Sequence, residues 1–482
     1  MPKLFGVVLP MVGIGMVGCA LDESAATDAV SIDDPGVAVM ERHGPGHLPS
    51  GTPVPNASGR ATTLSTTGSI DLGNEFFQDL GTNGRRCVSC HLPSAGWGIT
   101  PPQVRAIFEA TRGGQLDDQL GLGAIFRTND GSNSPDADVS TVAKRRQAYT
   151  MLLNHGLIRV GLPVPAAAEF ELVAVDDPYH HASAADVSMF RRPLPSANLK
   201  FLSTVMWDGR ETQPGMTIHF DLSQQATDAT EGHAQGAALD HAQRESIVAL
   251  ETSLFTAQVY DNNAGDLHAT GGNGGPDALV AQTFYIGIND NFGDSQTHAP
   301  FTPIVFDIYN AWASLPGNGT PAYRRQVARG QALFNTRTIN ISGVSGINDE
   351  DAFGNPATVP GTCTTCHDTP NSGNHSVVAP LNIGLTDASE RTPDMPLYTF
   401  RNKTTGEIKQ LTDPGRAMIS GKWKHLGRFK GPILRGLAAR APYFHNGSAA
   451  TLADAVNFYD RRFHIGLSAG EKADLTAFLE SL

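Results

Sequence analysis

The chain has 482 residues, which is long enough for two or three domains with hydrophobic cores of their own. Hydrophobic residues make up 40% of the chain and charged residues 17%, an ordinary balance for a globular protein. The formal net charge is −13 and no run of lysine and arginine stands out, which argues against nucleic-acid binding. An acidic surface does allow a cationic redox partner.

The first 19 residues are typical of an export signal. Lys3 supplies a short positive region, and the apolar stretch at 4–18 is too short to cross a bilayer as a helix. Met16-Val17-Gly18-Cys19 resembles the lipobox of bacterial lipoproteins, although that family usually has Leu where this chain has Met16. The resemblance implies acylation of Cys19, and an ordinary signal peptide is the alternative. We expect an exported, periplasmic lipoprotein anchored to the membrane.

Residues 20–65 are rich in Ser, Thr, Asp, Gly and Pro, a composition that predicts a flexible tether between a lipid and the folded part. No later segment has the run of about 20 apolar residues that a transmembrane helix needs.

Four of the five cysteines fall in two identical motifs, Cys87-Val88-Ser89-Cys90-His91 and Cys363-Thr364-Thr365-Cys366-His367. Cys-x-x-Cys-His is the attachment signature of c-type haem, in which the thiols bind the porphyrin and the histidine binds the iron. A shared zinc site would need two pairs that lie far apart, and disulfides would leave both histidines without a role. We expect two covalently bound haems, attached through Cys87, Cys90, Cys363 and Cys366, with His91 and His367 as iron ligands.

A similar short segment precedes each motif, at 73–77 and at 330–334, and both are predicted to end an amphipathic helix. This duplication predicts two cytochrome c-like haem domains, which we place at 66–320, with insertions, and at 321–482.

The rest of the chain favours helices joined by irregular segments. Gly-, Asn- and Asp-rich stretches at 128–140 and 261–276 are predicted loops. Apolar residues recur at helical spacing in 240–258 and 475–482, and a capping box at 468–471 begins the second of these helices. No sustained alternating pattern indicates a strand, so we expect a mostly α fold with long irregular loops and insertions.

Three segments resemble a known family. The sequences FKGPILR at 429–435 and APYFHNGS at 441–448 closely resemble the C-terminal half of bacterial di-haem cytochrome c peroxidases and MauG-type enzymes, and Trp207-Asp208-Gly209-Arg210 is similar to an element of their first half. The resemblance implies peroxide reduction at the N-terminal haem and electron acceptance at the C-terminal haem. It implies Trp207 as the electron relay between them, with a plain core aromatic as the alternative. Calcium between the domains and a homodimer are further implications.

The resemblance also guides the choice of the remaining iron ligand. Met418 is the expected sixth ligand of the second haem, because a thioether raises the reduction potential. Met395 is the alternative, and Met418 could equally be a packing residue. Tyr398 would be the ligand in the MauG branch, where a tyrosine takes this position. His445 is interpreted as a structural histidine.

Peroxide cleavage needs a group that moves a proton and a group that stabilises charge. In the family a Gln and a Glu after the Trp-Asp-Gly-Arg element serve this purpose, and here the corresponding residues are Gln225, Glu231 and His233. A removable iron ligand is a second interpretation of His233, and His155 is another possible ligand.

The resulting hypothesis is an oxidoreductase that reduces hydrogen peroxide to water with electrons from a small donor protein, a cytochrome c or a cupredoxin. Two alternatives stay open. One is an electron-transfer cytochrome without a substrate, and the other is a MauG-like enzyme that oxidises a protein or organic substrate.

Overall fold

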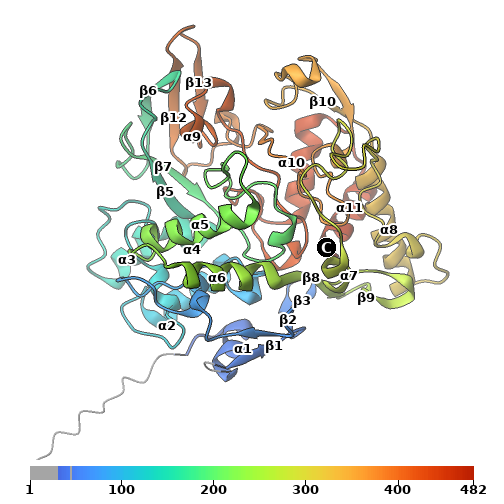
Figure 1. The fold of residues 1–482 in the computed structure, drawn as a ribbon, viewed down its shortest axis with the longest axis horizontal. Coiled ribbons are helices and arrows are strands. Elements are labelled where there is room, and N and C mark those ends of the chain that lie inside the picture. The colour runs from blue at the N-terminus through green and yellow to red at the C-terminus, as the bar shows by residue number, and fades with distance from the viewer. Residues whose placement is uncertain (1–30, 44–45) are drawn as a thin grey trace, which may run out of the picture.

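The computed structural model describes residues 31–43 and 46–482 of the chain (Figure 1). The predicted signal peptide with Cys19 lies outside the described residues, as does the start of the predicted tether. Within the described part, no helix combines the length and the apolar character that a membrane span requires. Export and lipid attachment therefore stay predictions.

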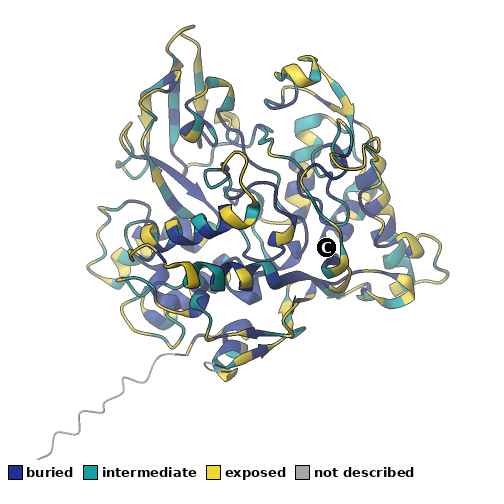
Figure 2. Ribbon diagram, viewed as in Figure 1, coloured by how far each residue is buried: buried dark blue, intermediate teal, exposed yellow. Residues whose placement is uncertain are grey.

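The fold is mixed, so the prediction of a mostly α protein is wrong. Helices contain 33% of the residues and strands 16%, and the described part has eleven α-helices and several sheets of two to four strands. Two of the strands show why the sequence did not predict any strand. β7 (Val187–Arg191) is buried at every position and β8 (Leu254–Asp261) at most positions (Figure 2). Neither strand has the polar face that produces an alternating pattern.

The described part of the predicted tether is folded, so that prediction is wrong for this segment. It contains α1 (Pro35–His43), β1 (His47–Pro49), β2 (Pro53–Asn56) and β3 (Gly59–Ser65). β3 pairs antiparallel with β8, and the Thr63 hydroxyl accepts the indole N–H of Trp97 at 2.9 Å. β4 (Ser69–Asp71) pairs with β1, and β9 (Gly265–Asp266) completes the sheet β2-β3-β8-β9. The small polar side chains of β3 are buried by a partner strand that is distant in sequence.

Five helices form the left and lower part of the molecule in Figure 1: α2 (Pro101–Thr111), α3 (Val142–Ala148), α4 (Thr150–His155), α5 (Ile218–Gly232) and α6 (His241–Ser253). The helix expected to end at 73–77 is instead a single 3-10 turn, Glu75–Phe77. Phe76 and Phe77 on this turn still pack edge-on against Trp97, with ring centroids 5.8 and 6.5 Å away. These aromatic contacts anchor the segment that leads into the first haem motif.

A second core lies on the right in Figure 1. It is formed by α8 (Thr320–Thr336), α10 (Leu452–Phe463) and α11 (Ala469–Glu480), next to α7 (Asp277–Ala281), β10 (Ile339–Ile341) and β11 (Val359–Gly361). The predicted helix over 330–334 is confirmed by α8. Phe306, Tyr309 and Trp312 are buried in the same core, so the chain before the second haem motif also packs around it.

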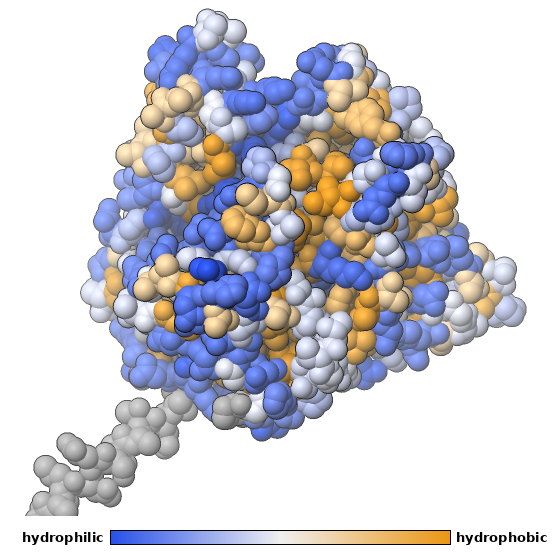
Figure 3. All heavy atoms as spheres, viewed as in Figure 1, coloured by the Kyte–Doolittle hydropathy of each residue, from blue (hydrophilic) through white to orange (hydrophobic). Residues whose placement is uncertain are grey.

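A third core joins two distant parts of the chain. β6 (Phe170–Asp176) pairs with β12 (Leu397–Asn402), which also pairs with β13 (Ile408–Leu411). β5 (Ile158–Leu162) pairs with β7, and α9 (Ala417–Ser420) lies in the same core. This strand-rich module projects at the upper left of Figure 1. Between it and the right-hand lobe, apolar side chains gather in a hollow near α10 and β10 (Figure 3).

Candidate functional site

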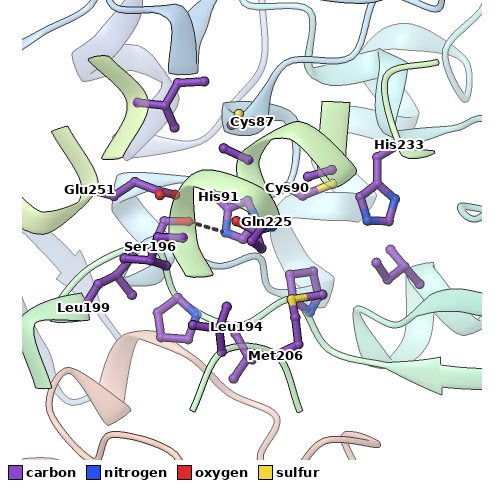
Figure 4. A pocket seen from close by; sticks show the side chains of 18 of the residues that line it. Cys87, Cys90, His91, Leu194, Ser196, Leu199, Met206, Gln225, His233 and Glu251 are labelled. Atoms are coloured by element: carbon purple, nitrogen blue, oxygen red, sulfur yellow. Dashed lines mark hydrogen bonds between the residues drawn. The ribbon is translucent and has the colours of Figure 1, made fainter. Parts of the chain in front are cut away.

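The first haem motif forms one wall of a cavity (Figure 4). Cys87–Ser89 make a 3-10 turn, and the backbone N–H groups of Cys90 and His91 both donate to the Cys87 carbonyl at 3.1 Å. This tight turn brings both thiols and the imidazole to the same cavity wall. No disulfide joins the two cysteines.

Hydrogen bonds at Nδ1 fix the orientation of the His91 ring. Its Nδ1–H donates to the Trp97 carbonyl at 3.0 Å and contacts the Ser196 hydroxyl at 3.2 Å. Burial lowers the pKa of His91 to about 4, so the ring is neutral at neutral pH. A neutral imidazole with its Nδ1–H engaged leaves Nε2 free for a metal ion, which is the usual arrangement of a histidine ligand.

The second haem motif repeats this arrangement in a second cavity. Cys363–Thr365 form the 3-10 turn, and the His367 Nδ1–H donates to the Gly373 carbonyl at 2.6 Å. Burial lowers the pKa of His367 as well. The wall is almost entirely apolar and includes side chains of β10, α10 and α11.

Buried cations beside the cavities fit a ligand that carries negative charge. Arg192 and Lys430 line the first cavity, and neither forms an ion pair among the described residues. Arg192 donates to carbonyls such as that of Ile99, and the Lys430 ammonium donates to the Thr204 carbonyl at 2.9 Å. Burial lowers the pKa of Arg192 to about 9 and that of Lys430 to about 7. An unpaired buried cation is costly, and haem propionates would supply the missing charge.

Trp207, Lys430 and Pro432 line both cavities. The position of Trp207 is fixed by its neighbour Asp208, which is fully buried and pairs with Arg191 at 2.5 Å. Arg191 also pairs with Asp413 at 2.7 Å, so this ion network ties the Trp-Asp-Gly-Arg element to the second half of the chain. The structure therefore places the predicted relay residue where the two cavities meet.

The residues predicted for peroxide chemistry separate into two groups. Gln225 and His233 line the first cavity, together with other α5 residues at helical spacing. Glu231 is exposed and outside the cavity, so the expectation that it takes part is wrong. Positions 222, 225, 226, 229 and 230 face the cavity, and residue 231 falls on the opposite side of this helix.

His233 is held by a buried carboxylate that the sequence did not indicate. Its Nδ1 hydrogen-bonds Asp130, and Asp130 pairs with Arg85, which also donates to the carbonyls of Ala124 and Ile125. Asp130 and Arg85 are both buried. Because Nδ1 is occupied, Nε2 is the ring nitrogen of His233 that is free to act in the cavity.

None of the residues predicted as the sixth ligand of the second haem lines the second cavity. Met418 and Tyr398 are buried in the third core, Met395 packs in a separate cluster, and the Tyr398 hydroxyl donates to the Ser188 carbonyl at 2.6 Å. The structure does not bring Met418 to this cavity, because Met418 on α9 packs in the third core with strand residues such as Phe170 and Tyr398.

Tyr459 is another residue that was not predicted from the sequence. It lies on α10 and lines the second cavity, where burial and the neighbouring Cys366 and Cys363 raise its pKa. The signal was present in the sequence, since 452, 455, 456, 459 and 463 recur at helical spacing and all line the cavity.

Two further histidines can be placed. His445 lines the second cavity and is buried, its ring stacks on Phe429 at 4.0 Å between centroids, and its Nε2 has no hydrogen-bond partner among the described residues. Burial lowers the pKa of His445 to about 4. His155 lines neither cavity and donates to Asp394 at 2.8 Å. No group of three or more His, Cys, Asp or Glu suited to a metal ion occurs within the described residues, so calcium stays a prediction.

The two cavities have the donor set of c-type cytochromes: two thiols, a neutral imidazole, apolar walls and unpaired cations. The chain is also similar in sequence to known cytochrome-c peroxidases. The chain is 32% identical over 132 residues to the cytochrome-c peroxidase IdrP2 of Denitromonas iodatirespirans and 31% identical over 140 residues to the cytochrome-c peroxidase IdrP1 of Pseudomonas sp. (strain SCT). Each match covers 25% of this chain and 36% of the relative. These likenesses confirm the predicted resemblance to cytochrome c peroxidases.

The likeness has limits that bear on function. The chain spans little more than a third of the length of the curated relatives it matches, and no family model matches the chain. A solved structure of a MauG-like protein associated with microbial copper homeostasis shares 15% sequence identity with a TM-score of 0.34, covering 85% of this chain and 88% of that one.

Proposed function

We propose that the chain is a di-haem c-type cytochrome that reduces hydrogen peroxide to water, H2O2 + 2 e− + 2 H+ → 2 H2O. The observation that carries the proposal is the asymmetry of two cavities that share Trp207. Both have a Cys-x-x-Cys-His wall, but among the described residues only the first combines it with an amide, Gln225, and an imidazole that a carboxylate holds, His233 with Asp130. Peroxide reduction belongs to the first cavity and electron entry to the second.

In this proposal the haem iron bound by His91 supplies the redox chemistry of O–O cleavage. The chain supplies the proton handling. His233 Nε2 takes a proton at one peroxide oxygen and returns it to the other, while Asp130 holds Nδ1 and keeps the ring in place. The Gln225 amide donates a hydrogen bond that stabilises developing negative charge. Trp207 provides the aromatic path between the cavities.

The proposal extends to the partner and the location. A small cytochrome c or cupredoxin with a basic surface would deliver electrons, because the formal net charge of −13 favours a cationic partner. The export signal and Cys19 would place the protein in the periplasm on a lipid anchor. Calcium binding and homodimer formation belong to the same proposal.

Tyr459 favours a second candidate function. In MauG-type enzymes a tyrosine is the distal ligand of the second haem, and Tyr459 lines the second cavity here, where the sequence predicted Met418. Such a protein would use peroxide to oxidise a protein or organic substrate.

The test has two stages. A haemochrome assay on the purified protein should give two haems per chain, and Cys363→Ala with Cys366→Ala should give one. The half-reduced protein is then mixed with hydrogen peroxide in a stopped-flow spectrometer. Stoichiometric oxidation within milliseconds supports peroxide chemistry. Slow bleaching, with both haems low-spin throughout, would reject it and leave an electron-transfer cytochrome.

A further inference from the structure

The first cavity contains a carboxyl group that the proposed chemistry does not use. Glu251 lies on α6, is 6% exposed and lines the cavity beside Cys87 and Ser196 (Figure 4). It forms no ion pair among the described residues, and its Oε2 atom has no hydrogen-bond partner there. Burial raises the pKa of Glu251 to about 7. Burying a carboxyl group without a partner lowers the stability of the fold, which favours a functional role for Glu251.

Ser196 lies between Glu251 and His91, the predicted iron ligand. The Ser196 hydroxyl lies 3.2 Å from His91 Nδ1, and the Glu251 carboxyl lies next to Ser196 in the wall of the same cavity (Figure 4). If Nε2 binds iron, the single Nδ1 proton is shared between the Trp97 carbonyl at 3.0 Å and the Ser196 oxygen at 3.2 Å, and Ser196 accepts. The single hydroxyl proton of Ser196 is then available to the neighbouring Glu251 carboxylate. The Ser196 backbone N–H donates to the Trp97 carbonyl at 3.0 Å, the same oxygen that accepts from His91, which fixes Ser196 in place.

We propose that Glu251 is a positioning residue for the axial ligand of the first haem, acting on His91 through Ser196. The carboxylate strengthens the donation from Nδ1, which makes the imidazole more basic toward the iron and favours the oxidised state. The inference rests on haem attachment at Cys87 and Cys90, and it is independent of the peroxide chemistry.

The second cavity supplies an internal contrast. His367 donates to the Gly373 carbonyl alone, and no Asp or Glu of the described chain lines that cavity. The buried Asp368 next to His367 is instead engaged by His375 and the Ser376 backbone N–H. The Glu251–Ser196–His91 contact would therefore lower the reduction potential of the first haem below its value without the carboxylate. A higher potential at the second haem suits electron acceptance, and a lower one at the first suits a haem that must be oxidised by its substrate.

Redox titration of the holoprotein, with each haem followed by its own spectrum, tests this assignment. Glu251→Gln keeps the shape and removes the charge, and Ser196→Ala breaks the connection without touching the carboxyl. Each should shift the oxidised-to-reduced ratio of the first haem about tenfold toward reduced, equal to about 59 mV for one electron. The reduction potential of the second haem should not change. The double variant should shift no further than either single variant, because both act along one hydrogen-bond chain.

Glu245→Gln is the matched control. Glu245 lies on the same helix but pairs with His219 at 3.1 Å outside the cavity, and it should leave both potentials unchanged. An unchanged potential of the first haem in Ser196→Ala and Glu251→Gln, with two haems attached, would overturn the inference. A wild-type protein with fewer than two haems per chain would instead overturn the proposed function on which the inference rests.

Discussion

The indole N–H of Trp207 donates to the carbonyl oxygen of Arg192 at 2.8 Å. Since the backbone N–H of Arg192 donates in turn to the His445 carbonyl at 2.7 Å, the ring is linked to a segment of the second cavity wall. Trp207 is thus fixed in a single orientation at the point where the two cavities meet.

Replacing this tryptophan should slow electron transfer between the haems. Trp207→Phe removes the N–H and the pyrrole part of the fused ring system, and we expect the second haem to be oxidised at least about tenfold more slowly after peroxide addition, a barrier increase of about 1.4 kcal/mol. Stopped-flow absorbance at the second haem measures the rate. Trp312→Phe is the control, because Trp312 is buried against Tyr309 and lines neither cavity. Equal rates in wild type and Trp207→Phe would rule out the relay.

The His233–Asp130 pair should control peroxide turnover. We expect His233→Gln to lower kcat/KM for peroxide by about 10²–10⁴-fold, the usual contribution of a general acid–base group. Asp130→Asn should lower it by a smaller factor and alter the pH profile, because the imidazole remains but its orientation is no longer held. Glu231→Gln, on the exposed side of the same helix, should behave as wild type. Normal turnover in His233→Gln would exclude a catalytic role for this residue.

The second haem should report on Tyr459 and not on Met418. Tyr459→Phe is expected to change the optical and EPR spectra of that haem, because the Tyr459 side chain lines its cavity. Met418→Leu should leave both spectra intact and lower the free energy of unfolding by less than about 1.5 kcal/mol, as for other volume-conserving core substitutions. The opposite pattern of spectral changes would restore Met418 as the ligand.

Acid should weaken the contact between α4 and the segment before β12. The hydrogen bond from His155 holds the pKa of Asp394 at about 2, below its ordinary value of 3.8. A lowered folded-state pKa stabilises the fold above pH 3.8, and this contribution is lost as the pH falls toward 2. Asp394→Asn should therefore be less stable than wild type at neutral pH, and the difference should shrink between pH 4 and 2 in chemical denaturation. A constant difference across this range would contradict the assignment.

Short-range features were predictable because their cause is local. The helix beginning at the 468–471 capping box is confirmed as α11, with Ser468 accepting the Glu471 N–H at 3.3 Å. The helix predicted over 240–258 exists only as far as Ser253. From Leu254 the chain becomes β8, because β3 offers it a pairing edge that lies far away in the sequence.

The sequence by itself determined where haem can attach, since two thiols and a histidine within five consecutive residues need no distant partner to define that chemistry. It also indicated Trp207, Gln225 and His233, which lie close together in one stretch of chain. Only the tertiary structure decided which residues line the second cavity and which lie on the Nδ1 side of His91 and His233. Asp130 and Glu251 reach these places through packing of segments that are remote in sequence, and no local pattern records such contacts. For Tyr459 the helical spacing of 452–463 showed which residues share a face, but only the packing of α10 showed that this face lines the second cavity.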